Sequence, residues 1–322
     1  MNGTKTSTVA RAAKCGGVDV GKTFLDAAID DPAFAPVRWP NTPEGRAAIV
    51  GFFRNHGVTR VGVEASGGYE IEIVEAMRDT GLHVAVLQPA QVRAYAQFLN
   101  QRAKTDPLDA VLIARCVTAQ RTVRKAPDPR LAPLAERMTL LEQIEEDITR
   151  HRTRLDRFRD EALIAEIKTE IARLCTRRRA ALGELRRLVR RHADLAERLD
   201  LLVSIDGIGE RTALTLVVRM PELGALSPGE AGSLAGMAPF TRRSGRWQGE
   251  SHVEGGRGRV GKALFAAAQA ASQRWNAELV AVYKRLRSAG KHHSVAIVAC
   301  ARKLIIYANA VLARKTPWEA RL

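Results

Sequence analysis

In the stretch Gly16-Gly17-Val18-Asp19-Val20-Gly21-Lys22-Thr23, apolar side chains alternate with other residues before the chain closes on a glycine. This alternation predicts a strand whose valines face a core, so Asp19 has to lie on the opposite face, at the sheet surface. A carboxylate there needs a partner, because uncompensated burial of a charge is costly. It is usually hydrogen-bonded, ion-paired or bound to a metal ion. Other carboxylates in this half of the chain are therefore candidates to converge on Asp19.

The same stretch matches the phosphate-binding pattern G-x-x-x-x-G-K-[ST], so a nucleotide-binding loop is an alternative interpretation. Such a loop needs a strand before its first glycine and a helix that opens at the lysine. Here the apolar strand lies inside the loop, and residues 23–29 continue as strand-like sequence. Asp19 would also repel the phosphates. The pattern favours two short antiparallel strands, over residues 18–20 and 24–29.

The composition indicates a polyanionic partner. Among 322 residues, Lys and Arg number 51 and Asp and Glu 35, which gives a net charge of +16 and a sequence pI of about 10.3. Such a surface favours nucleic acid over an acidic membrane. No apolar run reaches ~20 residues and the start lacks a signal-peptide core, so we expect a soluble cytoplasmic protein. Four widely spaced cysteines, without a C-x-x-C pair, predict free buried thiols in a reducing compartment.

After the first two strands, strand-like and helix-like segments alternate, which predicts an α/β layer with a mixed sheet. The expected strands cover residues 60–64 and 82–87. The expected helices cover residues 43–53, 70–78 and 89–99.

Three more acidic residues of this region could join Asp19. Glu64 ends a predicted strand, and Asp106 and Asp109 lie in the segment Lys104-Thr105-Asp106-Pro107-Leu108-Asp109. Asp106 as N-cap with Pro107 at the first helical position also fits a plain capped helix start. In both interpretations the two aspartates share one helix face. Four converging carboxylates would bind Mg²⁺, which can activate a nucleophile and stabilise a leaving oxygen in phosphoryl transfer.

The middle of the chain has a different character. From residue 131 to 199 Pro and Gly are nearly absent, and apolar residues recur in 3-4-3 steps typical of coiled coils: Leu131, Leu134, Met138 and Leu141, then Ile164, Ile167, Ile171 and Leu174. Residues 150–191 contain 14 Lys and Arg against 6 Asp and Glu. A solvated helical face explains this excess, and a basic dimerising hairpin that follows a phosphate backbone is the functional alternative.

The last third begins with the turn Ser204-Ile205-Asp206-Gly207-Ile208-Gly209 and a predicted helix from residue 210 to 218. This is the outline of a helix-hairpin-helix, in which Gly207 and Gly209 expose backbone N–H groups to a phosphate. An ordinary interhelical turn fits as well. A Gly-rich segment from 236 to 261 and two apolar helices, over residues 262–274 and 295–312, complete the chain.

Ser244 is a candidate nucleophile in Thr241-Arg242-Arg243-Ser244-Gly245-Arg246-Trp247. The arginines Arg242, Arg243 and Arg246 could bind a scissile phosphate and stabilise developing charge, while a hydroxyl near a metal ion attacks it. Taken alone, a serine in a basic loop more often only forms hydrogen bonds.

Together these segments resemble the DEDD-type transposases of bacterial insertion sequences (the insertion sequence 110 family, which includes bridge-RNA-guided recombinases) and the related Piv-type DNA invertases. The matching motifs are Gly17-Val18-Asp19-Val20-Gly21-Lys22, Gly62-Val63-Glu64-Ala65-Ser66-Gly67-Gly68, Arg102-Ala103-Lys104-Thr105-Asp106-Pro107-Leu108-Asp109-Ala110, and Ala235-Gly236-Met237-Ala238-Pro239-Phe240 with Arg243-Ser244-Gly245. They span nearly the whole chain in the family's order. The chain departs from the family at Asp206, where a proline is common.

The resemblance implies an α/β plus α architecture. We expect a disordered tail at residues 1–13, a RuvC-like domain of RNase H fold at 14–128, a coiled-coil dimerisation region at 129–199, and a mainly helical transposase domain with a helix-hairpin-helix at 200–322.

The resemblance also implies a catalytic site. A metal-binding tetrad, for Mg²⁺ or alternatively Mn²⁺, maps to Asp19, Glu64, Asp106 and Asp109, and the nucleophile maps to Ser244. Nucleic-acid contacts are expected from Lys104, Gly207, Gly209 and the three arginines around Ser244. The expected partners are DNA, a structured guide RNA and further copies of the chain, as a dimer that assembles into a tetramer. The resemblance implies that the two domains of different subunits share an active site in this assembly.

The sequence therefore predicts a transposase or DNA recombinase that works through a phosphoserine intermediate. Two alternatives remain open. One is a non-catalytic architectural or RNA-binding protein, in which the carboxylates are helix caps and ion pairs. The other is a RuvC-like junction resolvase, which would use metal-activated water and need no serine.

Overall fold

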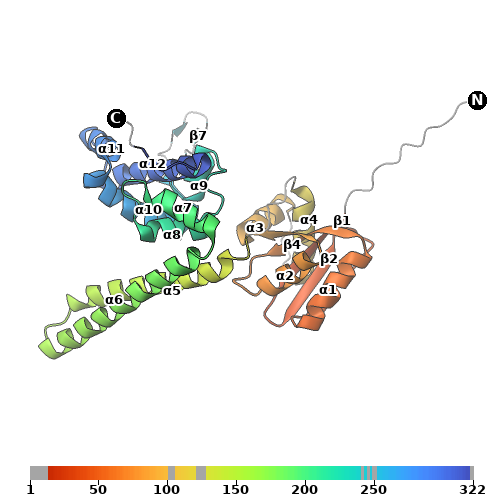
Figure 1. Ribbon diagram of the computed structural model, residues 1–322. Coiled ribbons are helices and arrows are strands. Elements are labelled where there is room, and N and C mark those ends of the chain that lie inside the picture. Colours follow the sequence, from red (N-terminus) through yellow and green to blue (C-terminus); the bar gives the residue numbers. More distant parts are fainter. Residues whose placement is uncertain are drawn as a thin grey trace, which may run out of the picture. The chain divides into compact units, whose positions relative to one another are not determined.

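The computed structural model describes residues 14–100, 106–120, 128–240, 243–244, 247–248 and 252–319, with the backbone alone for residues 106, 107, 243, 244, 247 and 248. The expected tail at residues 1–13 lies outside the described residues. The chain divides into two compact units, Met1–Pro127 and Asp128–Leu322 (Figure 1). The division of the second unit into a dimerisation region and a transposase domain stays a prediction.

The first unit is built on a five-stranded mixed sheet of order β3-β2-β1-β4-β5. Strands β1, β2 and β3 pair antiparallel, whereas β1, β4 and β5 pair parallel. This confirms the mixed α/β sheet and is consistent with an RNase H-like domain. The edge strand β3 was not expected, because its short, largely exposed sequence carries little alternation. The strands are β1 (Lys14–Val20), β2 (Phe24–Ile29), β3 (Val37–Pro40), β4 (Val58–Glu64) and β5 (His83–Leu87).

The opening stretch is a hairpin and not a nucleotide-binding loop. Residues 16–20 lie inside β1, the Gly21 N–H donates to the Phe24 carbonyl at 2.9 Å, and β2 follows at once. No helix opens at Lys22. The backbone N–H groups that would hold phosphates are therefore used in the sheet.

Two layers of helices cover the sheet. Alternation along β1 sends Val18 and Val20 to the face that is packed by α1 and α2, and Cys15 to the face that is packed by α3 and α4. The helix α1 begins as its sequence predicts, because the Thr42 side chain accepts from the Gly45 N–H at 3.3 Å. The helices are α1 (Pro43–Asn55), α2 (Ile71–Asp79), α3 (Pro89–Phe98) and α4 (Asp106–Ala119).

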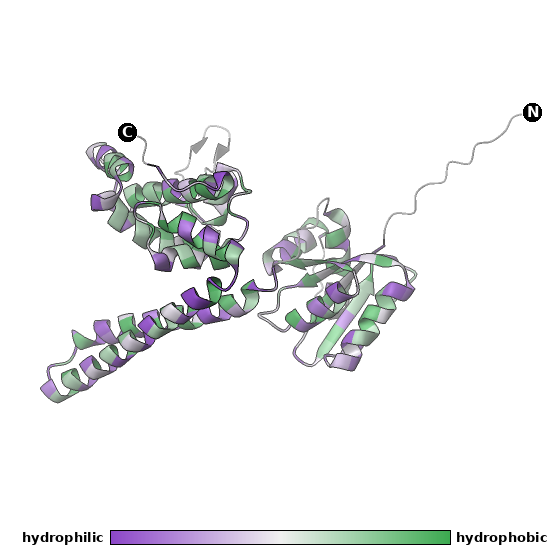
Figure 2. Ribbon diagram, viewed as in Figure 1, coloured by the Kyte–Doolittle hydropathy of each residue, from purple (hydrophilic) through white to green (hydrophobic). Residues whose placement is uncertain are grey.

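The second unit begins with an antiparallel pair of long helices, α5 (Leu131–Leu155) and α6 (Glu161–Val189) (Figure 1). Figure 2 shows hydrophilic and hydrophobic residues alternating along both. The base of the pair, with Met138 and Leu185, belongs to the large core of this unit, whereas Ile148 and Leu174 belong to a small separate cluster further out. Long helices in this region are thus as expected, and a coiled coil that dimerises through them stays a prediction.

The rest of the second unit is mainly helical. The expected helices over 262–274 and 295–312 correspond to α10 with a π-helical turn η1, and to α12, while α7, α9 and α11 had no expected counterpart. The helices are α7 (Ala193–Val203), α8 (Glu210–Arg219), α9 (Pro228–Leu234), α10 (Gly258–Ala270), η1 (Ala271–Trp275), α11 (Ala277–Ser288) and α12 (His293–Arg314). Short strand pairs join β6 (Pro239–Phe240) to β9 (His252–Val253) and β7 (Arg243–Ser244) to β8 (Trp247–Gln248).

Helix α12 is the central apolar helix of this unit. Among the described residues it alone is long and apolar enough to cross a membrane, but 56% of that window is buried inside the protein, as in a core helix. Its Cys300 is buried, and burial raises the pKa of this thiol to about 11. All four cysteines are free, and only Cys175 is not fully buried, as their spacing predicted.

Candidate active site

Asp19 and Glu64 lie side by side at the carboxyl ends of two neighbouring parallel strands. The register of β1 and β4 pairs Val18 with Val63, and each carboxylate is the next residue on its strand. Residues in register point to the same face, and neighbouring strands are about 4.8 Å apart. Both side chains are half-buried. The sheet thus presents two carboxylates together on the face opposite the valines, as the sequence predicts.

That face is not open, because α4 lies directly on it. A Cβ added at Gly17 would collide with the backbone at Ala110 and Ala114, and one added at Gly62 would lie 2.9 Å from the Ile113 Cγ2 atom. Gly17 and Asp19 are two residues apart on β1 and therefore share a face. The helix reaches the sheet at a distance that only glycine permits, directly beside the two carboxylates.

Arg60 fixes the direction in which α4 runs. Its Nη2 atom donates to the carbonyl oxygens of Val117 at 3.1 Å and Gln120 at 2.9 Å, so the C-terminal end of α4 lies at the start of β4. The Val117 carbonyl also accepts from the Gln120 N–H at 3.1 Å, and a cation suits the negative end of the helix dipole. The first turn of α4 therefore lies toward the other end of β4, where Glu64 is.

This direction brings the Asp-x-x-Asp motif to the carboxylates of the sheet. The helix begins at Asp106, and Asp109 in its first turn is half-buried next to Ala110, which contacts Gly17. The Asp106 side chain and Lys104 lie outside the described residues. Strand register and the direction of α4 thus put Asp19, Glu64 and the first turn of α4 toward the same end of this sheet face.

A carboxylate that the sequence analysis missed holds the loop after Glu64. The carboxylate of Glu70 accepts from the Ser66 N–H at 3.1 Å, the Ser66 hydroxyl at 3.0 Å and the Gly68 N–H at 2.8 Å. Burial alone would raise the pKa of Glu70, but these hydrogen bonds hold it below its ordinary value. The loop is folded back on itself, which fixes the backbone directly beyond Glu64.

Asp26 is a second carboxylate that the sequence analysis missed. It is the register partner of Asp19 across the hairpin, so it lies on the same face, and it is 4% exposed. Arg38, its own partner on β3, donates to both carboxylate oxygens at 2.9 and 2.8 Å. Alternation along β2 could have placed Asp26 on this face, but only the register shows that an arginine neutralises it.

The chemistry of the donor set fits Mg²⁺ or Mn²⁺. The predicted ligands are all carboxylates, and hard divalent cations prefer oxygen. Among the side chains that the structure describes, no three His, Cys, Asp or Glu groups gather closely enough to bind a metal ion. The side chains of Asp19, Glu64 and Asp109 are described and do not form such a group by themselves, and the Asp106 side chain lies outside the described residues, so the four-carboxylate site stays a prediction.

The structure describes Ser244 only by its backbone, in β7, where it pairs with Trp247 of β8. Arg242 and Arg246 lie outside the described residues, and the Arg243 side chain does so too. Because Ser244 belongs to the second unit and the carboxylates to the first, a shared active site stays a prediction.

The predicted phosphate contacts at Gly207 and Gly209 are placed in the turn between α7 and α8. Gly207 has φ +99° and faces η1, since an added Cβ would lie 3.2 Å from the Ala271 Cα atom. Backbone conformation and packing therefore both require a glycine at this position. Gly209 is exposed and is the N-cap of α8. Phosphate binding by this turn stays a prediction.

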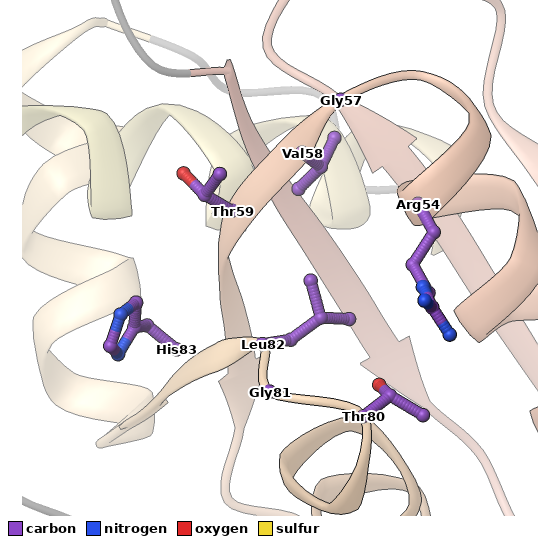
Figure 3. A pocket seen from close by; sticks show the side chains of 8 residues that line it. All are labelled: Arg54, Gly57, Val58, Thr59, Thr80, Gly81, Leu82 and His83. Carbon is purple, nitrogen blue, oxygen red and sulfur yellow. The ribbon is translucent and has the colours of Figure 1, made fainter.

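A shallow hollow lies at the opposite end of the parallel strands from the carboxylates (Figure 3). It is lined by Arg54 and by residues 57–59 and 80–83, at the starts of β4 and β5. In Figure 3 the side chains of Arg54 and His83 lie on opposite sides. The hollow therefore does not belong to the carboxylate site.

Comparison with protein families gives two matches. A family model described as a transposase, of the DEDD type of insertion sequence IS110, matches residues 16–164. A second, described as the transposase IS116/IS110/IS902 family, matches residues 199–284. The first match contains all four predicted tetrad positions and the second contains Ser244.

Comparison with curated proteins gives relatives of the same kind. The chain is 25% identical over 320 residues to the pilin gene-inverting protein of Moraxella bovis, and the alignment covers 95% of this chain and 98% of that protein. The protein of the same name from Moraxella lacunata gives the same identity and coverage. It is 35% identical over 125 residues to an insertion element IS110 protein of Streptomyces coelicolor, covering 38% of this chain and 30% of that protein.

Proposed function

We propose, from the premise that the chain belongs to the IS116/IS110/IS902 family of transposases and is therefore a DNA recombinase, that it cuts and rejoins DNA through a covalent link to Ser244. The metal-binding groups are Asp19, Glu64, Asp106 and Asp109. The observation that supports the proposal is the strand register that puts Asp19 beside Glu64, together with the direction of α4, whose first turn carries Asp106 and Asp109 toward the same end of the sheet.

In the first step, the Ser244 Oγ atom attacks the phosphorus of a phosphodiester. A phosphorus–oxygen bond forms to the serine, the bond to one deoxyribose oxygen breaks, the hydroxyl proton leaves and the released oxygen takes up a proton. Arg242, Arg243 and Arg246 bind the phosphate oxygens and stabilise their charge. Mg²⁺, when bound, would supply Lewis-acid stabilisation of the reacting oxygens. Attack of a hydroxyl from another strand on the phosphoserine rejoins the DNA.

The partners follow from the same premise. The curated relatives from Moraxella are named for inverting the pilin gene, and we extend to this chain inversion or transposition of a DNA segment. A structured RNA guides the choice of DNA sites, and the protein acts in the cytoplasm. The α5–α6 pair dimerises as a coiled coil, the dimers assemble into a tetramer, and the α7–α8 turn acts as a helix-hairpin-helix.

The test is incubation of purified protein with Mg²⁺, its guide RNA and DNA that carries the element ends, followed by denaturing electrophoresis. Wild type should give a protein–DNA adduct. Ser244→Ala should lose at least about a thousandfold of adduct formation while still binding nucleic acid. Asp19→Asn should also lose the adduct, because one metal-binding group is gone. Ser233→Ala, in the same unit, is the matched control and should keep full activity.

Other outcomes separate the competing functions. Cleavage without an adduct, unchanged in Ser244→Ala, would identify a junction resolvase that uses metal-activated water. Binding with neither cleavage nor adduct, for wild type with Mg²⁺ or Mn²⁺, would leave an architectural protein. Full adduct formation by Ser244→Ala would exclude this serine as the nucleophile.

A further inference from the structure

Trp275 is an exposed aromatic side chain on a rigid support. Its side chain is 63% exposed, which is unusual for the largest apolar residue. The Arg274 guanidinium lies 5.5 Å from the centre of the Trp275 ring, so a cation and a flat aromatic face are presented together. This pair forms the last two residues of η1, and π-helical turns occur frequently at functional sites.

The support of Trp275 is held on both sides. Asn276, which is 2% exposed, donates from Nδ2 to the Asp206 carbonyl at 3.0 Å and accepts from the Leu279 N–H at 3.1 Å, where it caps α11. On the other side, Ala271 packs against Gly207. The α7–α8 turn, η1 and the start of α11 thus form one corner, and the Trp275 ring needs little ordering to bind a flat partner.

The exposed side of α11 leads from this corner to a group of cations. Ala277 and Ala281 are exposed one turn apart, and Lys284 and Arg285 follow at the next turn, also exposed. Asn276 has extended backbone and separates Trp275 from α11, and a rise of 1.5 Å per residue puts Lys284 about 10 Å beyond Ala277 along this helix. The two small alanines leave space between the aromatic ring and the cations.

The charge of this surface is one-sided. Residues 271–291 contain five Lys and Arg and one acidic residue, Glu278. Glu278 accepts from the Tyr307 hydroxyl at 2.5 Å and so is occupied inside the unit. In the described part of the chain, no acidic side chain forms an ion pair with Arg274, Lys284 or Arg285. Such a surface attracts a polyanion.

We propose that the surface formed by Arg274, Trp275, Lys284 and Arg285 binds a single-stranded segment of nucleic acid. Trp275 stacks on one unpaired base, with Arg274 beside it, and the two cations on α11 contact phosphates further along the strand. Stacking on an aromatic side chain is available only to a base that is not enclosed in a duplex, so the surface discriminates strand state and not sequence. The proposal rests on the proposed function only in taking nucleic acid as the substrate.

The test is fluorescence anisotropy of the full-length protein with short labelled DNA and RNA single strands, and with the duplex of the same sequence. Trp275→Ala should weaken single-strand binding about 5- to 100-fold and leave duplex binding within about twofold. Trp275→Phe, which keeps an aromatic face, should restore most of the affinity. Phe98→Ala removes a 77% exposed aromatic residue from the first unit and should leave the affinity for single strands and for the duplex unchanged. If Trp275→Ala weakens binding of one kind of single strand more than the other, DNA or RNA, that kind is the strand which the surface binds.

The cations have a separate readout. Lys284→Ser with Arg285→Ser should reduce the slope of log affinity against log salt by about 1.4 for single strands, that is about 0.7 per phosphate contact. Arg190→Ser, at an arginine already paired with Asp200 at 2.6 Å, is the control and should leave the slope unchanged. Unchanged single-strand affinity in Trp275→Ala, or an equal loss for the duplex, would overturn the proposal. Neither result would bear on the proposed Ser244 nucleophile, because adduct formation is measured separately.

Discussion

Gly17 and Gly62 shape the candidate site through the side chains that they lack. Each faces α4, and a Cβ at either position would collide with that helix. Asp109 lies on α4, and Asp19 lies on β1 together with Gly17. The distance between α4 and β1 therefore decides how far the Asp109 carboxylate lies from Asp19. Catalytic groups tolerate little displacement, so these glycines position the predicted ligands.

Gly17→Ala tests this positioning. The added methyl group meets backbone atoms of Ala110 and Ala114, which cannot rotate away, so α4 must shift. We expect the free energy of unfolding to fall by about 1–3 kcal/mol and adduct formation to fall further than that loss of folded protein explains. Gly51→Ala in α1, with no atom within 4 Å of an added Cβ, should be neutral or stabilising by up to about 1 kcal/mol. Urea unfolding and the adduct assay measure the two effects, and equal behaviour of both variants would contradict the argument.

At the residue scale, alternation along the first strand selected Asp19, because the side-chain period of a strand is two, and a place at the end of a predicted strand selected Glu64. The same rule could not find the role of Arg60. Its acceptors, Val117 and Gln120, are 57 and 60 residues away and are carbonyls, which carry no sequence signal. Glu70 was missed for a similar reason, since its partners are mostly backbone N–H groups.

At the element scale, the 3-4 spacing of α5 had two meanings that the sequence could not separate. A coiled-coil seam and a helix packed on a globular core produce the same apolar stripe. The structure shows the second at the base of α5, where Met138 and Leu141 lie in the core of the second unit. Arginines of other helices hold this base. Arg219 on α8 and Arg259 on α10 both donate to Glu142, at 2.8 and 2.5 Å, so the helical pair is fixed to the unit that carries Ser244.

Glu142→Gln should loosen that attachment. The Glu142 side chain is 13% exposed and forms ion pairs with Arg219, Arg259 and, at 4.0 Å, Arg211, so the loss of its charge leaves Arg219 and Arg259 without their counter-ion. We expect a destabilisation of about 2 kcal/mol, between the values typical of exposed and buried pairs, measured by urea unfolding. Glu184 on α6 is 39% exposed and pairs with Arg137 on α5. Glu184→Gln should therefore lower the free energy of unfolding by less than about 0.5 kcal/mol. A similar cost for both would mean that the network does not hold α5.

At the scale of the whole molecule, the predicted chemistry is divided between two units. The carboxylates belong to Met1–Pro127 and Ser244 to Asp128–Leu322. Composition predicted a polyanionic partner, because net charge sums over all residues whatever their positions. It could not predict whether a serine and a metal site of one chain meet, since that depends on how units and copies assemble. The family resemblance implies that different subunits supply the two halves of each active site, and this stays a prediction.

A mixing experiment tests that division. Asp19→Asn and Ser244→Ala chains, each inactive alone, should recover adduct formation when co-expressed, because a mixed pair contains one site with intact carboxylates and an intact serine. Random pairing gives about half mixed dimers, each with one working site, so roughly a quarter of wild-type activity is expected. The adduct should form only on the Asp19→Asn chain. A tag on one of the two chains gives them different masses, so electrophoresis shows which chain carries the adduct. Recovery requires exchange between copies and cannot arise if each chain completes its own site. Absence of recovery in mixed dimers isolated by two tags would place both halves of the site in one chain.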